Sequence, residues 1–159
     1  MKQRISAGAI IINDSKILLV HHKKEGQFDF WVPPGGGVEN DEGIFKCVER
    51  EVFEETNLIV KPRKIAYIEE LIDDNTYICK IWVICAIIDG TIGLRNLDAN
   101  ESFLQDAKFL SFEEIQNKKV YPDLIKTTLW DDYKKGFPKI KYIGFRKDNI
   151  GSNTSPNSA

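Results

Sequence analysis

The sequence predicts a single α/β domain in which helices flank a β-sheet core. A chain of 159 residues is long enough for one compact domain and too short for two ordinary ones. Segments rich in β-branched and aromatic residues recur along it, and a proline-free stretch of helix formers lies between them. With 42% hydrophobic and 29% charged residues, the composition is that of a globular protein with a packed core.

The first strands are expected in a hairpin near the N-terminus. Ala7–Ile12 and Lys16–His21 are aliphatic and β-branched, and residues 13–15 between them are Asn, Asp and Ser, which favour turns. An aromatic-rich segment, Gln27–Val32, then leads into a Pro-Pro-Gly-Gly-Gly run at residues 33–37. Prolines disfavour a helix and glycines permit backbone angles that other residues resist, so this run is expected to be a shaped loop.

The central helix is expected from Asn40 or Asp41, either of which can cap it, to about Thr56. Two long strands follow at Arg63–Ile72 and Thr76–Ile88, and residues 73–75 (Asp, Asp, Asn) form the turn that joins them. These strands are expected to pair in antiparallel fashion.

The last third of the chain contains weaker signals. Asp106–Leu110 is a short strand candidate, and Ser111-Phe112-Glu113-Glu114 has the form of a capping box. Pro122–Tyr133 predicts one last helix with proline in its first turn. The domain is expected to span residues 1–147, because the Ser/Asn/Gly/Pro-rich segment 148–159 has almost no apolar content and is expected to be a disordered tail.

The central helix carries carboxylates on a face that should be buried. At roughly 100° per residue, one face collects apolar side chains: Ile44, Cys47, Val48 and Val52. The opposite face collects charged ones: Glu42, Lys46 and Glu49. Glu51 and Glu55 nevertheless fall on the apolar face, with Glu54 at its edge.

Carboxylates that are buried close together protonate, pair or bind a cation, and a hard divalent ion with oxygen ligands removes both their desolvation and their repulsion. The alternative is that this end of the helix meets solvent, where Arg50 and nearby lysines screen the acids. Helix geometry alone leaves both open. Glycines immediately before a helix also suit phosphate binding, although no P-loop sequence is present.

The spacing of these residues closely resembles the Nudix box, G-x5-E-x7-R-E-U-x-E-E-x-G-U, where U is a bulky aliphatic residue. Gly36 is followed after five residues by Glu42, and after seven more by the run Arg50-Glu51-Val52-Phe53-Glu54-Glu55-Thr56-Asn57-Leu58. One fixed position departs, since Asn57 stands where the family has glycine. Asparagine is the best substitute for glycine in a left-handed helix cap. The resemblance extends over roughly residues 4–115, including Trp31 and residues 34–39.

The resemblance implies an α/β/α sandwich with a mixed β-sheet and a metal-dependent site. Carried over by position, the Mg²⁺ ligands would be Glu51, Glu54 and Glu55, completed by the carbonyl of Gly36; Mn²⁺ also suits such oxygen ligands. Arg50 would orient the carboxylates, and Gly35, Gly36 and Gly37 would face the substrate. Relatives often use a further acid in a loop well downstream of the box as a metal ligand or base. Glu101 is the candidate here and Asp98 the alternative.

The activity implied by the resemblance is hydrolysis of a phosphoanhydride bond in a nucleoside diphosphate linked to another group. Nucleoside triphosphates, nucleotide sugars and dinucleoside polyphosphates all remain open. The alternative is a catalytically inactive nucleotide-binding or sensing module on the same fold, but loss of activity usually shows as broken box acids, and all three acids are present here. Pro62 lies too close to the box to match the downstream proline of typical ADP-ribose hydrolases, so the hypothesis of a specialised ADP-ribose hydrolase has no support.

Other candidate residues have ordinary explanations as well as functional ones. His21 and His22 end a strand beside two lysines, where they could meet an anion, but solvated strand ends are common. Four aromatic residues could stack on a base or fill the core: Phe28, Phe30, Trp31 and Trp82. Tyr77 lies near the position of a tyrosine typical of diadenosine-polyphosphate hydrolases, with a slightly long offset.

Charge and cysteine content limit the partners. With 22 basic and 24 acidic residues, the net charge of -2 provides no broad surface for nucleic acid or a membrane, and it gives no support to an RNA-decapping enzyme. The expected partner is a small nucleotide substrate. Three cysteines without C-x-x-C spacing fit a reducing compartment, so a cytoplasmic location is expected. Dimers are common among relatives, and a homodimer is one of the oligomeric states that the sequence leaves open.

Overall fold

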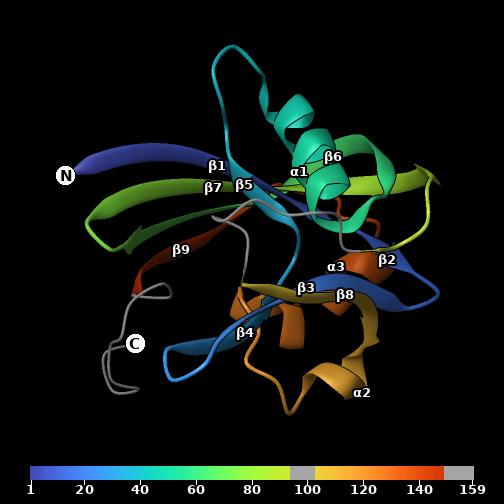
Figure 1. Cartoon of the computed structure of the whole chain (residues 1–159). Coiled ribbons are helices and arrows are strands. Elements are labelled where there is room, and N and C mark those ends of the chain that lie inside the picture. Colours follow the sequence, from blue (N-terminus) through green and yellow to red (C-terminus); the bar gives the residue numbers. More distant parts are fainter. Residues whose placement is uncertain (94–102, 149–159) are drawn as a thin grey trace.

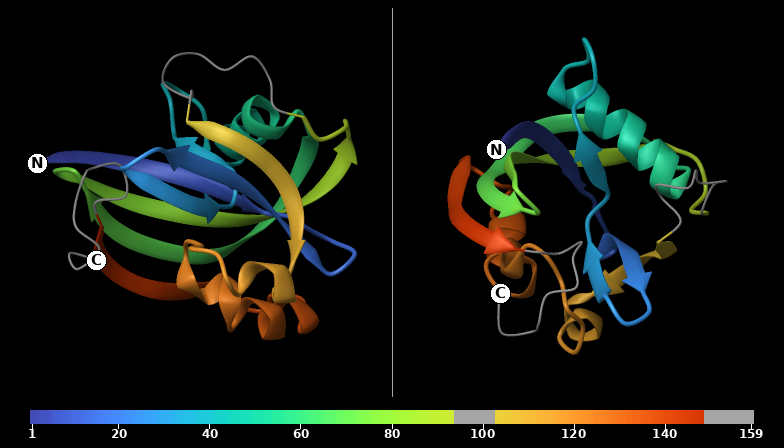
Figure 2. Two further views of the ribbon diagram at one scale, coloured as in Figure 1. Left: turned by 60° about the horizontal axis from the view of Figure 1, so that its bottom comes forward. Right: turned by 60° about the vertical axis from the view of Figure 1, so that its left-hand side comes forward.

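A computed structural model describes residues 1–93 and 103–148 of the chain. Its strands form two sheets that lie between α1 (Ile44–Thr56) on one side and the short C-terminal helices on the other (Figure 1). Both views of Figure 2 keep α1 and the C-terminal helices on opposite sides of the sheets. The expected α/β/α arrangement is therefore confirmed.

The larger sheet has five strands in the order β5-β1-β7-β6-β9. Its strands are β1 (Lys2–Ile10), β5 (Gly35–Gly37), β6 (Ile59–Asp73), β7 (Thr76–Asp89) and β9 (Lys141–Asp148). β1 runs parallel to β7, and β6 runs parallel to β9, whereas the β1–β5 and β6–β7 pairs are antiparallel. The sheet is thus mixed, as expected, and the predicted antiparallel pair downstream of α1 is confirmed with an earlier start at Ile59.

The smaller sheet contains β2 (Ile12–Asn13), β3 (Lys16–Lys24), β4 (Phe28–Val32) and β8 (Leu104–Ser111), all paired antiparallel. The predicted hairpin exists only at its tip, where β2 meets β3 across a turn with positive φ at Asp14 and Ser15. Residues 7–10 instead pair with β7, because the chain passes from one sheet to the other at Ile11. The prediction was wrong about this part of the hairpin.

The ends of α1 were predicted with mixed success. The N-cap residue is Gly43 and not Asn40 or Asp41, because Glu42 accepts a hydrogen bond from the Glu39 N–H at 3.0 Å and holds residues 39–42 in a turn before the helix. At the other end, Asn57 adopts the left-handed conformation, with φ of 66°, and donates its N–H to the Phe53 carbonyl. The expected role of Asn57 as a C-terminal cap is confirmed.

The C-terminal region departs further from the prediction. The capping box of α2 (Phe112–Ile115) is confirmed, but the single helix expected at Pro122–Tyr133 is two helices, η2 (Asp123–Lys126) and α3 (Leu129–Lys134). The backbone leaves the helical region at Thr127. Trp130 Nε1 donates to the Ile125 carbonyl at 2.8 Å, which is the acceptor that a continuous helix would use for the N–H of Leu129. β9 was not predicted.

Two apolar clusters hold these layers together. The first joins both sheets to the C-terminal helices, with fully buried members such as Trp82, Leu19, Ile125 and Leu129. The second packs α1 against β1, β3, β6 and β7, with Val48, Val52, Ala9, Leu18, Val60 and Val83 among its members. The acidic face of α1 therefore begins at the edge of a packed core.

Several expectations concern residues beyond this description. Glu101 and Asp98 lie outside the described residues, as does the predicted tail apart from Asp148, which ends β9. Among the helices of the described residues, none combines the length and the apolar character needed to cross a membrane.

Candidate functional site

The glycine run before α1 is a strand rather than the expected shaped loop. Gly35–Gly37 forms β5, in which Gly36 pairs with Ala7 of β1, and none of its three glycines has a positive φ. Close approach explains the absence of side chains. A Cβ would lie 2.5 Å from the Ala7 carbonyl oxygen at Gly35, and 2.4 Å from Glu51 Oε1 at Gly36. The glycines thus let β5 lie directly between β1 and the acids of α1.

The acidic face of α1 is arranged as the helical periodicity predicts. Glu51 and Glu55 are 8% and 5% exposed, on the same face as the buried Cys47, Val48 and Val52. Glu54 lies at the edge, with its side chain 42% exposed. Two of the three acids are therefore buried beside the glycine strand, and the third faces solvent in part.

Arg50 connects these acids to the turn before the helix. Its guanidinium forms two hydrogen bonds with Glu42, at 3.0 and 2.6 Å, and its Nη1 lies 2.9 Å from Glu51 Oε1 and 3.3 Å from Glu54 Oε2. The hydrogen bonds from Arg50 lower the pKa of Glu42 to about 2, and the carboxylates of Glu42 and Glu51 in turn raise the pKa of Arg50. Within residues 1–93 and 103–148, no three acidic, histidine or cysteine side chains converge to enclose a metal ion, since Arg50 lies between Glu51 and Glu54.

Glu55 is the acid whose charge is least compensated. Its Oε1 accepts a long hydrogen bond, 3.4 Å, from the Gly35 N–H, and its buried Oε2 has no hydrogen-bond partner among the described residues. Burial, reinforced by the neighbouring Glu51 carboxylate, raises the pKa of Glu55 well above its ordinary value. Burial and Glu51 also raise the pKa of Glu54. Such a group is stabilised either by a proton or by a cation.

Ser6 and Lys80 complete the surroundings of β5, and sequence reasoning missed both. The Ser6 hydroxyl donates to the Gly36 carbonyl at 2.8 Å, and Lys80 Nζ donates to Ser6 Oγ at 3.1 Å. The Gly36 carbonyl also accepts a weak hydrogen bond from Cys47 Sγ at 3.6 Å. A signal for Lys80 was present, because it lies between Ile78 and Trp82 at the two-residue spacing of one strand face.

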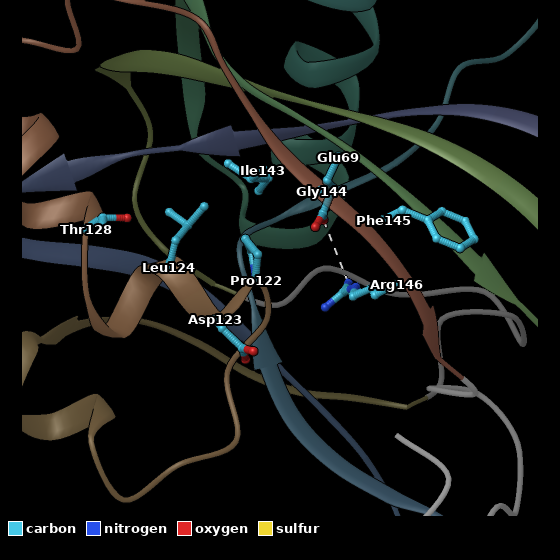
Figure 3. Close-up of a pocket in the computed structure, with 9 residues that line it drawn as sticks. All are labelled: Glu69, Pro122, Asp123, Leu124, Thr128, Ile143, Gly144, Phe145 and Arg146. Carbon is cyan, nitrogen blue, oxygen red and sulfur yellow. Dashed lines mark ion pairs between the residues drawn. The ribbon is translucent and has the colours of Figure 1, made fainter.

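A cavity of about 220 Å³ opens beside this group. Its lining comes from β1, β3, β4, β5, β6, β7 and β9 and includes Gly35, Gly36, Lys80, Phe30 and Arg146. A second cavity of about 420 Å³ lies between η2 and β9, and Glu69 and Arg146 line both cavities. Figure 3 shows these two side chains pointing toward each other, with Arg146 Nη2 3.7 Å from Glu69 Oε1. The site therefore combines an acidic pair, a glycine strand and adjoining space for a ligand.

The histidines and aromatic residues divide between core and cavity. His21 stacks on Trp31 at 4.4 Å and pairs with Asp29 at 2.5 Å, away from the cavity lining. His22 lines the cavity and stacks on Phe30, and burial, together with the nearby His21 and Lys80, lowers its pKa to about 4.

Trp31 and Trp82 are buried in the first apolar cluster, although Trp82 also borders the cavity. Phe28 packs edge-on against Phe103, and Tyr77 stacks on Phe145 at 6.4 Å. None of Phe28, Trp31 and Tyr77 is among the residues that line the cavity.

Similarity to known proteins identifies the family. The family model of the NUDIX domain matches residues 2–131. The chain belongs to the Nudix family. It is 29% identical over 122 residues to the uncharacterized Nudix hydrolase YvcI of Bacillus subtilis (strain 168), a match that covers 76% of this chain and 73% of that protein. It is also 29% identical over 124 residues to the ADP-ribose pyrophosphatase of Methanocaldococcus jannaschii, covering 77% of this chain and 73% of that protein.

Solved structures support the same fold. A NUDIX hydrolase from Nitrosomonas europaea superposes with a TM-score of 0.74 at 18% identity, covering 93% of this chain and 81% of that one. An ADP-ribose pyrophosphatase from Streptococcus suis 89-1591 gives a TM-score of 0.60 at 21% identity, covering 91% of this chain and 98% of that one. By family and by its relatives, the protein is a Nudix hydrolase of the pyrophosphohydrolase class.

Proposed function

We propose that this Nudix hydrolase cleaves a phosphoanhydride bond in a nucleoside diphosphate linked to another group, and that it needs a divalent cation. The observation that carries the proposal is the buried pair Glu51 and Glu55 beside the glycine strand, where Glu55 Oε2 has no hydrogen-bond partner among the described residues. A buried carboxylate left in this state is costly, and a cation removes the cost.

The residues around β5 fit Mg²⁺, or Mn²⁺ in its place, because hard divalent cations prefer carboxylate and carbonyl oxygens. Glu51, Glu54 and Glu55 would hold it, with the Gly36 carbonyl as a further ligand. Glu54 would have to leave Arg50 Nη1, which lies 3.3 Å away, and Gly36 would give up the weak hydrogen bond from Cys47. When bound, the cation supplies charge neutralisation for the diphosphate and a lower pKa for an attacking water.

The other residues of the site position the reacting groups. Arg50 keeps the Glu51 carboxylate oriented toward β5 through a charge-assisted hydrogen bond, while Glu42 anchors Arg50 from the other side. The backbone of Gly35, Gly36 and Gly37 leaves room for a diphosphate beside the acids. One acid must accept a proton from water; either a box glutamate or Glu101 would serve, and Glu101 lies outside the described residues.

The reaction class and the names of relatives support this substrate group. A nucleoside diphosphate linked to another group includes nucleoside triphosphates, nucleotide sugars and dinucleoside polyphosphates. ADP-ribose, a nucleoside diphosphate linked to ribose, also belongs to this group, and the Methanocaldococcus jannaschii relative is named an ADP-ribose pyrophosphatase. The position of Pro62 is therefore not sufficient to exclude ADP-ribose as a substrate.

The test is hydrolysis of a substrate panel by the purified protein, with Mg²⁺, Mn²⁺ or EDTA, followed by identification of the products. The panel contains nucleoside triphosphates, nucleotide sugars, ADP-ribose and diadenosine polyphosphates. Glu55→Gln removes the charge of the buried acid. Glu49→Gln is the matched control, because Glu49 lies on the same helix and pairs with Lys46 at the surface.

We expect metal-dependent release of a nucleoside monophosphate or of pyrophosphate, with loss of at least about a hundredfold in Glu55→Gln and little change in Glu49→Gln. Turnover that is unaffected by EDTA, or equal activity of the two variants, would contradict the proposed roles. Failure to cleave any member of the panel would contradict the proposed substrate group.

A further inference from the structure

Lys80 is a half-buried cation on the wall of the cavity beside β5. Among the described residues, its ammonium has one hydrogen-bond partner, Ser6 Oγ at 3.1 Å, and no carboxylate within ion-pairing distance. It also lies 4.8 Å from the centroid of the Trp82 ring. Burial lowers the pKa of Lys80 and the nearby carboxylates of Glu55 and Glu69 oppose this, but neither carboxylate pairs with the ammonium directly. Two of the three N–H donors of the ammonium have no partner among the described residues, so this position suits an anion that enters the cavity.

The position of Lys80 relative to the glycine strand defines where that anion would lie. A Cβ at Gly35 would lie only 2.9 Å from Lys80 Nζ, while a Cβ at Gly36 would lie 2.4 Å from Glu51 Oε1. Adjacent residues of a strand face opposite sides of the sheet, so the ammonium and the acids approach β5 from opposite faces. Because β5 is an edge strand of its sheet, a diphosphate that reaches both groups would lie across this edge. Glu69, the cross-strand neighbour of Lys80, already accepts a hydrogen bond from Trp82 Nε1 at 3.1 Å and lies 3.7 Å from Arg146 Nη2.

We propose that Lys80 binds the substrate phosphate that faces the cavity, and that Ser6 positions it. This inference rests on the proposed function, because it places one phosphate of the diphosphate near the acids of α1 and the other near Lys80. An ammonium on a flexible stem suits a phosphate oxygen. Ser6 would connect Lys80 to β5, since its hydroxyl accepts a hydrogen bond from Lys80 and donates one to the Gly36 carbonyl. Lys80 is therefore a substrate-binding residue and Ser6 a positioning residue.

The experiment measures binding of methylenediphosphonate, a diphosphate analogue that cannot be hydrolysed because carbon replaces the bridging oxygen, by isothermal titration calorimetry in the presence of Mg²⁺. Mn²⁺ binding without diphosphonate is measured separately by electron paramagnetic resonance. The variants are Lys80→Gln, which removes the charge, Lys80→Arg, which keeps it, and Ser6→Ala. Lys61→Gln is the matched control, because Lys61 is an exposed lysine on β6 of the same sheet.

We expect Lys80→Gln to weaken diphosphonate binding at least about tenfold, with Lys80→Arg recovering most of the loss and Lys61→Gln unchanged. Mn²⁺ binding should stay within about threefold in all of them, because the acids are intact. Ser6→Ala leaves the charge of Lys80 in place, so it should weaken diphosphonate binding less, by about threefold. It tests the inference even if Lys80→Gln does not fold.

Unchanged diphosphonate binding in folded Lys80→Gln would overturn the inference. So would an equal loss of Mn²⁺ and diphosphonate binding, because Lys80 would then act only through the acids. Failure of this inference can be distinguished from failure of the proposed function. If wild-type protein binds diphosphonate through Lys80 but cleaves no substrate, the proposed activity is refuted and the phosphate-binding role of Lys80 is retained.

Discussion

Gly36 shows that a residue without a side chain can be as constrained as a charged one. Its neighbours are the Ala7 backbone on one strand and the Glu51 carboxylate on α1. The family pattern marks this position as glycine, but the physical cause here is the space that the acid occupies. The backbone itself is extended and would accept other residues.

Gly36→Ala should therefore damage the site more than the fold. The added methyl would displace Glu51, so we expect Mn²⁺ binding and turnover to fall at least about tenfold, while the free energy of unfolding falls by about 1–3 kcal/mol. Gly43→Ala is the control, because a Cβ there meets nothing within 4 Å and φ is -85°. Metal titration, turnover and urea unfolding of both variants check this. Equal losses of Mn²⁺ binding in the two would show that the contact with Glu51 is irrelevant.

His22 should make stability depend on pH below neutrality. Its pKa is about 4 in the folded protein, against an ordinary value of 6.5. Between pH 6.5 and 4 the unfolded chain therefore binds a proton at this histidine and the folded chain does not. The stabilisation is complete above pH 6.5 and declines as pH falls toward 4, by a total on the order of 3 kcal/mol.

His22→Gln removes this proton uptake from both states. Urea unfolding at pH 7 and pH 4.5 should therefore show a smaller loss of stability for the variant than for wild-type protein, by about 2 kcal/mol. Carboxylates titrate in both proteins and cancel in the comparison. Identical pH profiles would mean that His22 keeps an ordinary proton affinity when folded.

At the scale of the element, α1 is held by its ends and one buried face. Its N-cap provides no side-chain hydrogen bond, and the turn before it depends on Glu42, which Arg50 holds from the second turn of the same helix. Its C-terminus depends on Asn57, whose side-chain amide also donates to the Thr91 carbonyl at 3.1 Å. The helix that carries the acids is thus fixed at both ends by residues of the Nudix box.

Replacement of Asn57 should separate its two contributions. Asn57→Ala forces a Cβ into the left-handed region without the amide, so we expect the free energy of unfolding to fall by about 1–2 kcal/mol. Asn57→Gly removes the amide but relieves the backbone, and it should lie close to wild type. Thermal or urea unfolding of the two variants checks this. If glycine were as destabilising as alanine, the bond to Thr91 and not the backbone conformation would be the main contribution of Asn57.

At the scale of the whole molecule, one buried acid joins three separate elements. Asp132 of α3 accepts hydrogen bonds from Tyr67 of β6, at 2.6 Å, and from Lys141 of β9, at 2.5 Å. Burial alone would raise the pKa of Asp132, but the bonds from Lys141 and Tyr67 outweigh it and hold the pKa below its ordinary value of 3.8. This acid therefore stabilises the fold at neutral pH, and the effect is lost as pH falls through its lowered pKa.

Asp132→Asn should consequently destabilise the protein at pH 7 by about 2–3 kcal/mol, because Lys141 loses its counter-charge and Tyr67 a strong acceptor. Its neighbour Asp131 is exposed, so Asp131→Asn should change stability by less than about 0.5 kcal/mol. Chemical denaturation at pH 7 compares the two directly. A loss shared equally by both variants would point to helix effects in α3 instead of the three-element contact.

The sequence by itself determined the features that depend on near neighbours in the chain. Helical periodicity was sufficient to place Glu51 and Glu55 on the buried face of α1, because successive side chains are related by a constant rotation. The left-handed cap at Asn57, the capping box at Ser111 and the turn at residues 73–75 are equally local. The Nudix box itself is a contiguous stretch, so it too could be recognised without knowledge of the path of the chain.

Only the tertiary structure decided what depends on strand pairing. Ser6 and Lys80 meet although 74 positions separate them, and β9 pairs with β6 from the far end of the chain. The glycine run becomes a strand because β1 lies beside it, and the expected last helix breaks where Trp130 takes the Ile125 carbonyl. Such contacts arise from sheet order and register, which bring distant residues together by the path of the backbone and leave little trace in local composition.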